Sequence, residues 1–203
     1  PKMPFDAAQG TTLTAERVYA CVDAHLDDDM VLLVEPGDGF CVAPEFHIEE
    51  PDNFIVQSYY ASIGYCSPAA VGVAMARPDK RVFILAGDGA FQMTAQEVST
   101  LIRERCPGIL LIVNNNGYLI ERKLHEDGPY NDIHMWNYSR LGDLFGGDDF
   151  VLNFYTTNEQ ELAQAMQTAW ASKDNFVIIE AVIPNNDCSA ALQRLGDTFR
   201  QSK

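Results

Sequence analysis

RVFILAGDGAFQMTAQE, residues 81–97, holds the clearest local signal in this sequence, because an aspartate lies between two glycines directly after an apolar run. Asp-Gly after apolar residues is typical of a two-residue β-hairpin turn. The residues that follow favour a different structure, since Thr94 and Glu97 have the spacing of a capping box that starts a helix. We therefore expect a strand over 81–86, a glycine-bounded turn, and a helix from Thr94 to about Arg105.

Apolar strands alternate with capped helices along the rest of the chain. Further helices are expected where a capping side chain or a first-turn proline precedes a helical pattern, at Thr14, Ser67-Pro68, Asn158 and about Ser189. Further strands are expected at 30–34, 53–57, 109–113, 150–155 and 176–182. Strands rich in Val, Ile and Leu without polar alternation indicate a parallel sheet that is covered on both faces. The sequence therefore predicts a single doubly wound α/β domain over residues 1–203, with a mostly parallel sheet of about six strands.

Length and composition exclude several classes of protein. The 203 residues, 47% of them hydrophobic, suffice for one core, and the formal charge of -15 argues against nucleic acid or an anionic membrane as partner. No apolar run approaches the ~20 residues that span a bilayer, and the first residues lack a signal-peptide pattern. We therefore expect a cytoplasmic protein. The five cysteines are odd in number and never spaced as CxxC, which favours reduced thiols.

Polar residues follow two neighbouring strands, at the ends where doubly wound sheets bind their ligands. The turn at 87–89 offers backbone N–H groups to an anion, and Asp88 beside a phosphate makes sense if Mg²⁺ lies between them. NNNGYLIE, residues 114–121, adds amide oxygens and a glycine carbonyl, although Asn-Gly turns are also common in plain loops. The combination predicts a magnesium and phosphate site, and the cation and helix dipoles would offset the acidity of the chain.

Gly87-Asp88-Gly89, 24 intervening residues (90–113) and Asn114-Asn115 together resemble the cofactor motif of thiamin diphosphate enzymes. The segments GDGAFQMTAQEV, NNNGYLIE and HEDGPYNDIHMWNY resemble the diphosphate-binding domain of the pyruvate decarboxylase family, particularly its bacterial members, with indolepyruvate and phenylpyruvate decarboxylases close by. The resemblance extends from about Leu13 to the C-terminal helix. It implies a thiamin diphosphate-binding fold, thiamin diphosphate and Mg²⁺ as cofactors, and a carboxy-lyase that converts a small 2-oxo acid to an aldehyde and carbon dioxide.

The resemblance also implies roles for individual residues. Asp88, the Asn115 side chain and the backbone carbonyl of Gly117 would bind Mg²⁺. Further cofactor contacts would come from Gly37, Asp38, Ala61, Ile63, Gly89, Ala90 and Tyr118. Ile63 would hold the cofactor in its bent shape, and the Ala61 carbonyl would accept a hydrogen bond from the cofactor's 4′-amino group. Bending matters because it brings that amino group to the acidic carbon.

Glu121 matches the family's catalytic glutamate, which faces the reacting carbon and would transfer a proton or assist product release. From spacing alone it would be a solvated helix residue paired with a neighbour such as Arg122. Two positions depart from the family: Pro36 stands where threonine is usual, and Phe40 where bacterial members can carry tryptophan. These departures bear on substrate size more than on cofactor identity.

Half of the family's active site has no counterpart in these 203 residues. In the family, the cofactor lies between this domain and a pyrimidine-binding domain from a second subunit. We therefore expect a C-terminal fragment of a larger homo-oligomeric decarboxylase, a dimer or tetramer, that is inactive when isolated. The alternatives are one subunit of a split enzyme, a carboligase that forms acetolactate, and a phosphate- or nucleotide-binding regulatory domain that has no use for Glu121.

Overall fold

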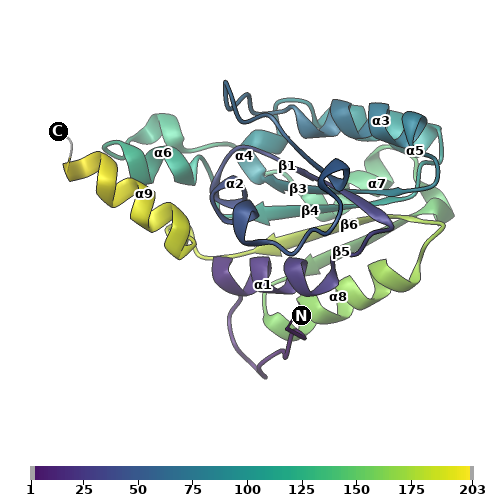
Figure 1. Ribbon diagram of the computed structural model, residues 1–203, viewed down its shortest axis with the longest axis horizontal. Coiled ribbons are helices and arrows are strands. Elements are labelled where there is room, and N and C mark those ends of the chain that lie inside the picture. Colours follow the sequence, from purple (N-terminus) through teal and green to yellow (C-terminus); the bar gives the residue numbers. More distant parts are fainter. Residues whose placement is uncertain (1–2, 202–203) are drawn as a thin grey trace.

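A single parallel sheet organises the computed structural model, which describes residues 3–201 (Figure 1). The ends of the predicted domain, residues 1–2 and 202–203, lie outside the described residues. The strand order is β2-β1-β3-β4-β6-β5, and every pairing is parallel. The strands are β1 (Met30–Val34), β2 (Phe54–Val56), β3 (Arg81–Gly87), β4 (Gly108–Asn114), β5 (Val151–Thr156) and β6 (Phe176–Val182). The predicted doubly wound α/β fold is confirmed.

Helices cover both faces of the sheet (Figure 1). One face packs against α1, α2 and α8, and the other against α3, α4, α5 and α7. Helices α6 and α9 contact each other beyond the carboxyl ends of the strands. The bounds are α1 (Ala15–His25), α2 (Asp38–Val42), α3 (Cys66–Ala76), α4 (Asp88–Phe91), α5 (Val98–Arg103), α6 (Leu119–Leu124), α7 (Leu141–Leu144), α8 (Glu159–Ala171) and α9 (Ala190–Gln201).

The central strands are apolar throughout because both of their faces are covered. In β3, Phe83 and Leu85 join the core beneath α1 and α8, whereas Val82 and Ile84 join the core beneath α3 and α5. This alternation follows from the two-residue period of a strand. The register pairs Gly87 with the penultimate residue of β4, so the two strands end at the same level. Their polar exits are therefore neighbours.

The segment after β3 differs from the prediction in two ways. β3 runs through Gly87 and α4 starts at Asp88, so no separate turn intervenes. The parallel pairing of β3 with β1 and β4 excludes the hairpin, as predicted. The capping box is also wrong. The Thr94 hydroxyl donates to the Gly64 carbonyl at 2.7 Å, and the expected helix is a 3-10 turn, Ala95–Glu97, followed by α5.

The other predicted helix starts divide into two kinds. Thr14 and Asn158 accept first-turn N–H groups of α1 and α8, as predicted. Ser67 does not cap α3, because the helix already begins at Cys66. The Cys66 N–H donates instead to the Glu35 carboxylate at 2.7 Å. The carboxylate of Glu35, far away in sequence, thus caps the start of α3 in place of the predicted Ser67 hydroxyl.

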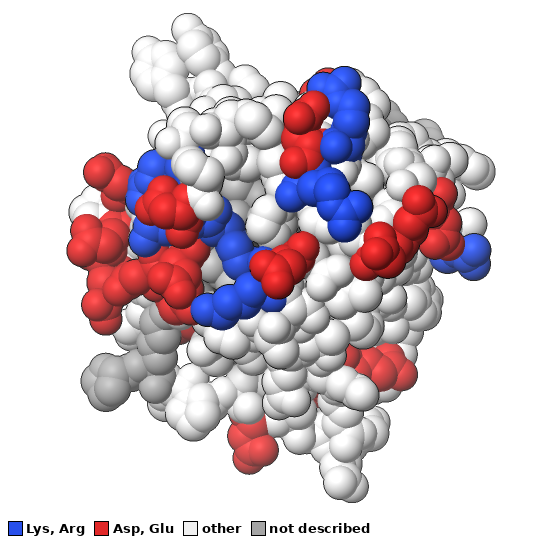
Figure 2. Space-filling model, turned by 90° about the vertical axis from the view of Figure 1, so that its right-hand side faces the viewer, with Lys and Arg blue, Asp and Glu red and all other residues white. Residues whose placement is uncertain are grey.

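Charges of both signs share the face that lies opposite the carboxyl ends of the strands (Figure 2). Ion pairs at the helix ends and in the loops that lead into the strands join Arg77 to Asp79, Arg103 to Glu104, Arg105 to Asp149 and Lys173 to Asp29. This intermingling leaves no broad basic area on the face shown. Within residues 3–201, none of the helices combines the length and the apolar character needed to cross a membrane.

Candidate cofactor and metal site

The chain changes direction across the sheet between β1 and β3. From β1 it moves outward to β2, and then crosses back to β3 on the other side of β1. Open α/β sheets bind ligands at such a switch point, beyond the carboxyl ends of the strands. A hollow at this point is lined by most of the predicted site residues, namely Gly37, Asp38, Ile63, Asp88, Gly89, Ala90, Asn115, Gly117 and Tyr118. Ala61 and Glu121 do not line it.

Asp88 is buried at the exit of β3, where its side chain is held by backbone groups. One carboxylate oxygen accepts the Gly89 N–H at 2.8 Å, and the other accepts the Gly117 N–H at 3.0 Å. Burial raises the pKa of Asp88 to about 6, although these N–H donors act to lower it. The carboxylate therefore links the exits of β3 and β4, at the place where a cation is expected.

The three consecutive asparagines after β4 have three different environments. Asn114 points away from the hollow, and its amide donates to the Glu180 carboxylate at 2.8 Å. Asn115 lines the hollow, and its side-chain oxygen is buried with no hydrogen-bond partner among the described residues. Asn116 has a φ of 62°, a left-handed conformation that asparagine tolerates. Of the three side chains, only that of Asn115 presents an unpartnered oxygen to the hollow.

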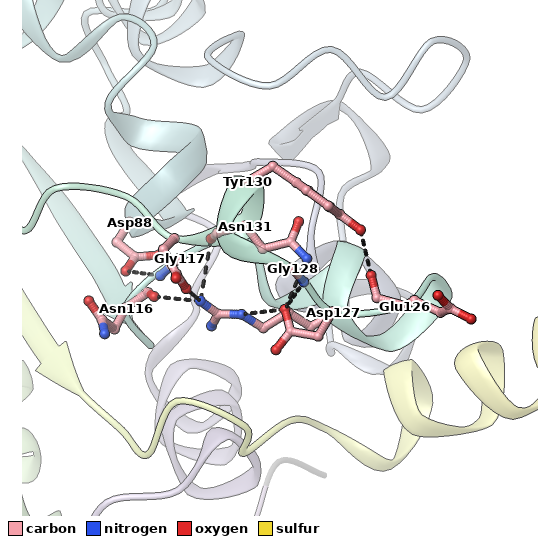
Figure 3. Close-up of polar contacts among 10 residues, drawn as sticks. Asp88, Asn116, Gly117, Glu126, Asp127, Gly128, Tyr130 and Asn131 are labelled. Carbon is pink, nitrogen blue, oxygen red and sulfur yellow. Dashed lines mark hydrogen bonds and ion pairs between the residues drawn. The ribbon is translucent and has the colours of Figure 1, made fainter.

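Arg122 supports the turn at Asn116 and Gly117, which Figure 3 shows next to Asp88. Its Nη2 donates to the carbonyls of Asn116 at 3.0 Å and Asn131 at 3.3 Å, and to the Asp132 carboxylate at 2.8 Å. A Cβ at Gly117 would lie 2.3 Å from the Asn131 carbonyl oxygen and 2.5 Å from this Nη2, and φ is 138°. Only glycine fits there, which explains the residue type in this part of the motif.

Glycine is also needed where Tyr118 packs on the start of α4. A Cβ at Gly89 would lie 2.6 Å from the Tyr118 ring. Tyr118 thus closes one side of the hollow against the backbone of Gly89 and Ala90. Gly37 also lines the hollow; its φ is 146°, and nothing lies within 4 Å of the Cβ that it lacks. Gly37 thus leaves room for a ligand to approach the backbone, whereas Tyr118 occupies the space beside Gly89.

Asp38 lies on the hollow, but its carboxylate is engaged by the start of α9. The Ser189 N–H donates to it at 2.9 Å, and the Ser189 hydroxyl donates to its other oxygen. Burial raises the pKa of Asp38, and the bonds from Ser189 act to lower it. Sequence reasoning missed Ser189 as a site residue, since no local pattern pairs two residues 151 positions apart.

The predicted ring-contacting segment after β2 is largely exposed. Ala61 has a φ of 50°, which is uncommon for a residue with a Cβ, and Ile63 is 40% exposed at the rim of the hollow. The Glu35 carboxylate, from the exit of β1, accepts the Gly64 N–H at 3.0 Å. Glu35 is a second residue that sequence reasoning missed. The signal in the sequence that could have identified Glu35 is its position at a strand exit, next to Pro36 and Gly37.

Glu121 lies in the middle of α6, outside the hollow. Its side chain is 48% exposed and lies 3.9 Å from the imidazole of His125. The alternative pairing with Arg122 is wrong, because that guanidinium is buried and its ion pairs are with Asp127 and Asp132. The preceding residue, Ile120, does line the hollow. Glu121 thus stands one residue from the site, with its carboxylate accessible.

The residues present fit a hard divalent cation. A buried oxygen without a partner is unfavourable by about 1–3 kcal/mol, and a cation bound to Asn115 would remove that penalty. Asp88 supplies a carboxylate, and the Gly117 carbonyl, which accepts the Leu119 N–H at 3.0 Å, retains a second lone pair. Oxygen ligands of these kinds suit Mg²⁺. No group of three or more His, Cys, Asp or Glu side chains in the described part of the chain could bind a metal.

Comparisons with known proteins identify the family of this chain. The family model described as "Thiamine pyrophosphate enzyme, C-terminal TPP binding domain" matches residues 39–181. An alpha-keto-acid decarboxylase of Mycobacterium tuberculosis (strain ATCC 25618 / H37Rv) is 37% identical over 189 residues, which are 93% of this chain and 34% of that protein. Pyruvate decarboxylase 4 of Arabidopsis thaliana is 34% identical over 195 residues, which are 95% of this chain and 32% of that protein.

A solved structure supports the fold. The crystal structure of benzoylformate decarboxylase from Polynucleobacter necessarius matches with a TM-score of 0.75 at 22% identity, covering 91% of this chain and 36% of that one. The chain thus spans about a third of the length of the relatives it matches. The resemblance predicted from the two strand-exit motifs is confirmed: the chain belongs to the family of C-terminal TPP-binding domains of thiamine pyrophosphate enzymes.

Proposed function

We propose that this chain is the thiamin diphosphate- and Mg²⁺-binding domain of a nonoxidative 2-oxo acid decarboxylase. The observation that carries the proposal is the unpartnered, buried oxygen of Asn115, which lies on the same hollow as Asp88 and Gly117. The printed names of the relatives, alpha-keto-acid decarboxylase and pyruvate decarboxylase, support the reaction class. The substrate is a small 2-oxo acid, such as pyruvate, indolepyruvate or phenylpyruvate, and the products are an aldehyde and carbon dioxide.

The residues of this chain bind and orient the cofactor. When bound, thiamin diphosphate supplies the carbon nucleophile and the electron sink for decarboxylation. Asp88, Asn115 and the Gly117 carbonyl hold the cation that neutralises the diphosphate, and Gly89 and Ala90 bring the backbone close to it. Ile63, at the rim of the hollow, supports the rings.

Glu121 is the residue that we assign to proton transfer. Its carboxylate is accessible on α6, one residue from the apolar wall formed by Ile120. A carboxyl group in this position can protonate the reacting carbon or assist product release once substrate and partner domain exclude water. The role of Glu121 therefore depends on the complete enzyme rather than on this chain alone.

The missing half of the site comes from a pyrimidine-binding domain, which we place in a second subunit of a cytoplasmic homo-oligomer, a dimer or tetramer. A chain that spans about a third of its relatives supports a C-terminal fragment of a larger enzyme. A separate subunit of a split enzyme is the alternative. The isolated chain is expected to be inactive.

Product analysis with the full-length enzyme, thiamin diphosphate and Mg²⁺ tests this proposal. Incubation with pyruvate, phenylpyruvate or indolepyruvate should release carbon dioxide and the matching aldehyde in equal amounts. Acetolactate from pyruvate would instead identify a carboligase. Binding of a nucleoside diphosphate without turnover of any 2-oxo acid would identify a regulatory domain, and either result would overturn the assignment.

A further inference from the structure

The turn between β2 and α3 carries Ala61 and Ile63 but has little packing of its own. Tyr59 is 87% exposed and Tyr60 is 79% exposed. The Gln57 side chain accepts the N–H groups of Tyr60 at 3.1 Å and Ser62 at 3.3 Å, so these bonds stay within the turn itself. Contacts of this kind shape the turn, but they do not fix it to the sheet. Its position must therefore be set at its ends.

Gly64 is the point at which the turn is attached to the rest of the domain. Its N–H donates to the Glu35 carboxylate at 3.0 Å, and its carbonyl accepts the Thr94 hydroxyl at 2.7 Å. Both polar groups of this one residue are thus bound by side chains from other segments. A Cβ on Gly64 would lie 2.6 Å from the Met93 Cβ, and φ is 82°, so the backbone sits tightly against the segment after α4.

Glu35 fixes the turn from the β1 side. It is 2% exposed, and its second carboxylate oxygen accepts the Cys66 N–H at 2.7 Å, at the start of α3. Burial raises the pKa of Glu35, whereas these N–H donors act to lower it. A glutamine could accept only one of the two bonds through its amide oxygen, because its NH₂ group is a donor. The carboxylate is thus matched to two backbone donors that flank residue 65.

Thr94 fixes the turn from the β3 side. It follows α4, which begins with Asp88, so a single hydroxyl ties the diphosphate segment to the ring-supporting turn. This bond also explains why Thr94 does not form the capping box that its spacing with Glu97 predicts. Thr94 does not line the hollow, and it has no contact with the predicted magnesium ligands among the hydrogen bonds of the described residues.

We propose that Glu35 and Thr94 are positioning residues, which hold Gly64 so that Ala61 and Ile63 meet the rings of the cofactor. This inference rests on the proposed function. Different segments then bind the diphosphate and the rings of the cofactor. The magnesium and diphosphate ligands come from the exits of β3 and β4, whereas Gly64 controls only the segment after β2. Loss of either bond to Gly64 should weaken ring binding and leave diphosphate binding intact.

Calorimetry on the full-length enzyme tests this separation with two probes, thiamin diphosphate and inorganic diphosphate, each with Mg²⁺. Thr94→Val keeps the shape of the side chain and removes the hydroxyl, so affinity for thiamin diphosphate should fall about three- to tenfold, the effect of one hydrogen bond. Affinity for inorganic diphosphate should stay within about twofold of the wild type. Thr94→Ser, which keeps the hydroxyl, should restore thiamin diphosphate binding, and Glu35→Gln should behave like Thr94→Val.

Thr156→Val is the matched control, since the buried Thr156 hydroxyl also donates to a distant backbone carbonyl, that of Glu180, at 3.1 Å. It should change neither affinity. Unchanged thiamin diphosphate affinity in Thr94→Val, or an equal loss for both probes, would overturn the positioning role while the proposed function stands. Failure of the wild type to bind thiamin diphosphate would overturn the proposed function, and this inference with it.

Discussion

Asp88 is a buried carboxylate, and none of the ion pairs among the described residues includes it. Two backbone N–H groups stabilise it, yet burial still raises its pKa to about 6, from an ordinary 3.8. An ionised carboxylate in this position is unfavourable until a cation joins it. Without Mg²⁺, the residue that we assign to metal binding should therefore destabilise the fold at neutral pH.

This destabilisation gives a pH-dependent prediction for Asp88→Asn. Because the unfolded chain loses the Asp88 proton at lower pH than the folded chain, the favourable contribution of this group is present below pH 3.8 and is lost as pH rises through about 6. Without divalent cations, the difference in unfolding free energy between wild type and Asp88→Asn should shift by about 2 kcal/mol in favour of the variant between pH 4 and 7.

Urea unfolding at both pH values measures this difference. Asp79→Asn, at an exposed aspartate, is the control and should show no comparable shift. A wild-type to Asp88→Asn difference that is the same at pH 4 and pH 7 would contradict the raised pKa.

Glu121→Gln separates catalysis from binding. The side chain lies outside the hollow, so affinity for thiamin diphosphate and Mg²⁺ should be unchanged, while turnover of the 2-oxo acid falls about 100-fold or more. Steady-state kinetics and calorimetry on the full-length enzyme measure the two effects. Glu126→Gln, a nearby exposed change, should leave both unaltered. Near-normal turnover of Glu121→Gln would contradict the catalytic role of Glu121.

The predicted magnesium ligands are residues that lie within the two motifs. Asp88, Asn115 and Gly117 meet at one hollow, as the spacing of the two motifs indicates. The motif does not say why Asn115 rather than Asn114 faces the hollow, because that choice depends on the Glu180 carboxylate of a strand far along the chain. Side-chain direction at a strand exit is set by such long-range partners.

At the scale of elements, strands were easier to predict than helix starts. A buried strand needs only a run of apolar residues, and β3, β4 and β6 have such runs. A capping pattern must compete with every other partner that the fold brings to the same hydroxyl or amide. The Thr94 hydroxyl donates to the Gly64 carbonyl instead, and the Cys66 N–H at the start of α3 donates to the Glu35 carboxylate. Each partner is about 30 residues away in sequence.

The turn from β4 into α6 should tolerate no side chain at Gly117. Gly117→Ala adds a Cβ 2.3 Å from a backbone carbonyl, whereas Gly37→Ala, at the similar φ of 146°, meets nothing within 4 Å. In each variant, alanine strains the backbone at this positive φ, which should lower the free energy of unfolding by about 1–3 kcal/mol. Only Gly117→Ala adds a clash, so it should lose about 2 kcal/mol more. Urea unfolding of both variants checks this, and equal losses would contradict the tight packing behind the metal turn.

At the scale of the whole molecule, strand order creates the site. The alternation of apolar strands and helices predicted the class of fold, and the reversal between β1 and β3 explains why segments from four strand exits meet. The sequence pattern does not place α6 against α9, since that contact joins residues far apart and depends on the close approach of Gly196 to the Lys123 backbone. The second half of the cofactor pocket belongs to the partner domain in our proposal.

The Mg²⁺ dependence of thiamin diphosphate binding by the full-length enzyme tests the central claim most directly. We predict that Asn115→Ala raises the half-saturating Mg²⁺ concentration at least tenfold but does not lower the free energy of unfolding without metal, because it removes a buried oxygen that lacks a partner. The exposed Asn186→Ala serves as control. Unchanged Mg²⁺ dependence in Asn115→Ala, or wild-type binding that needs no Mg²⁺, would contradict the account.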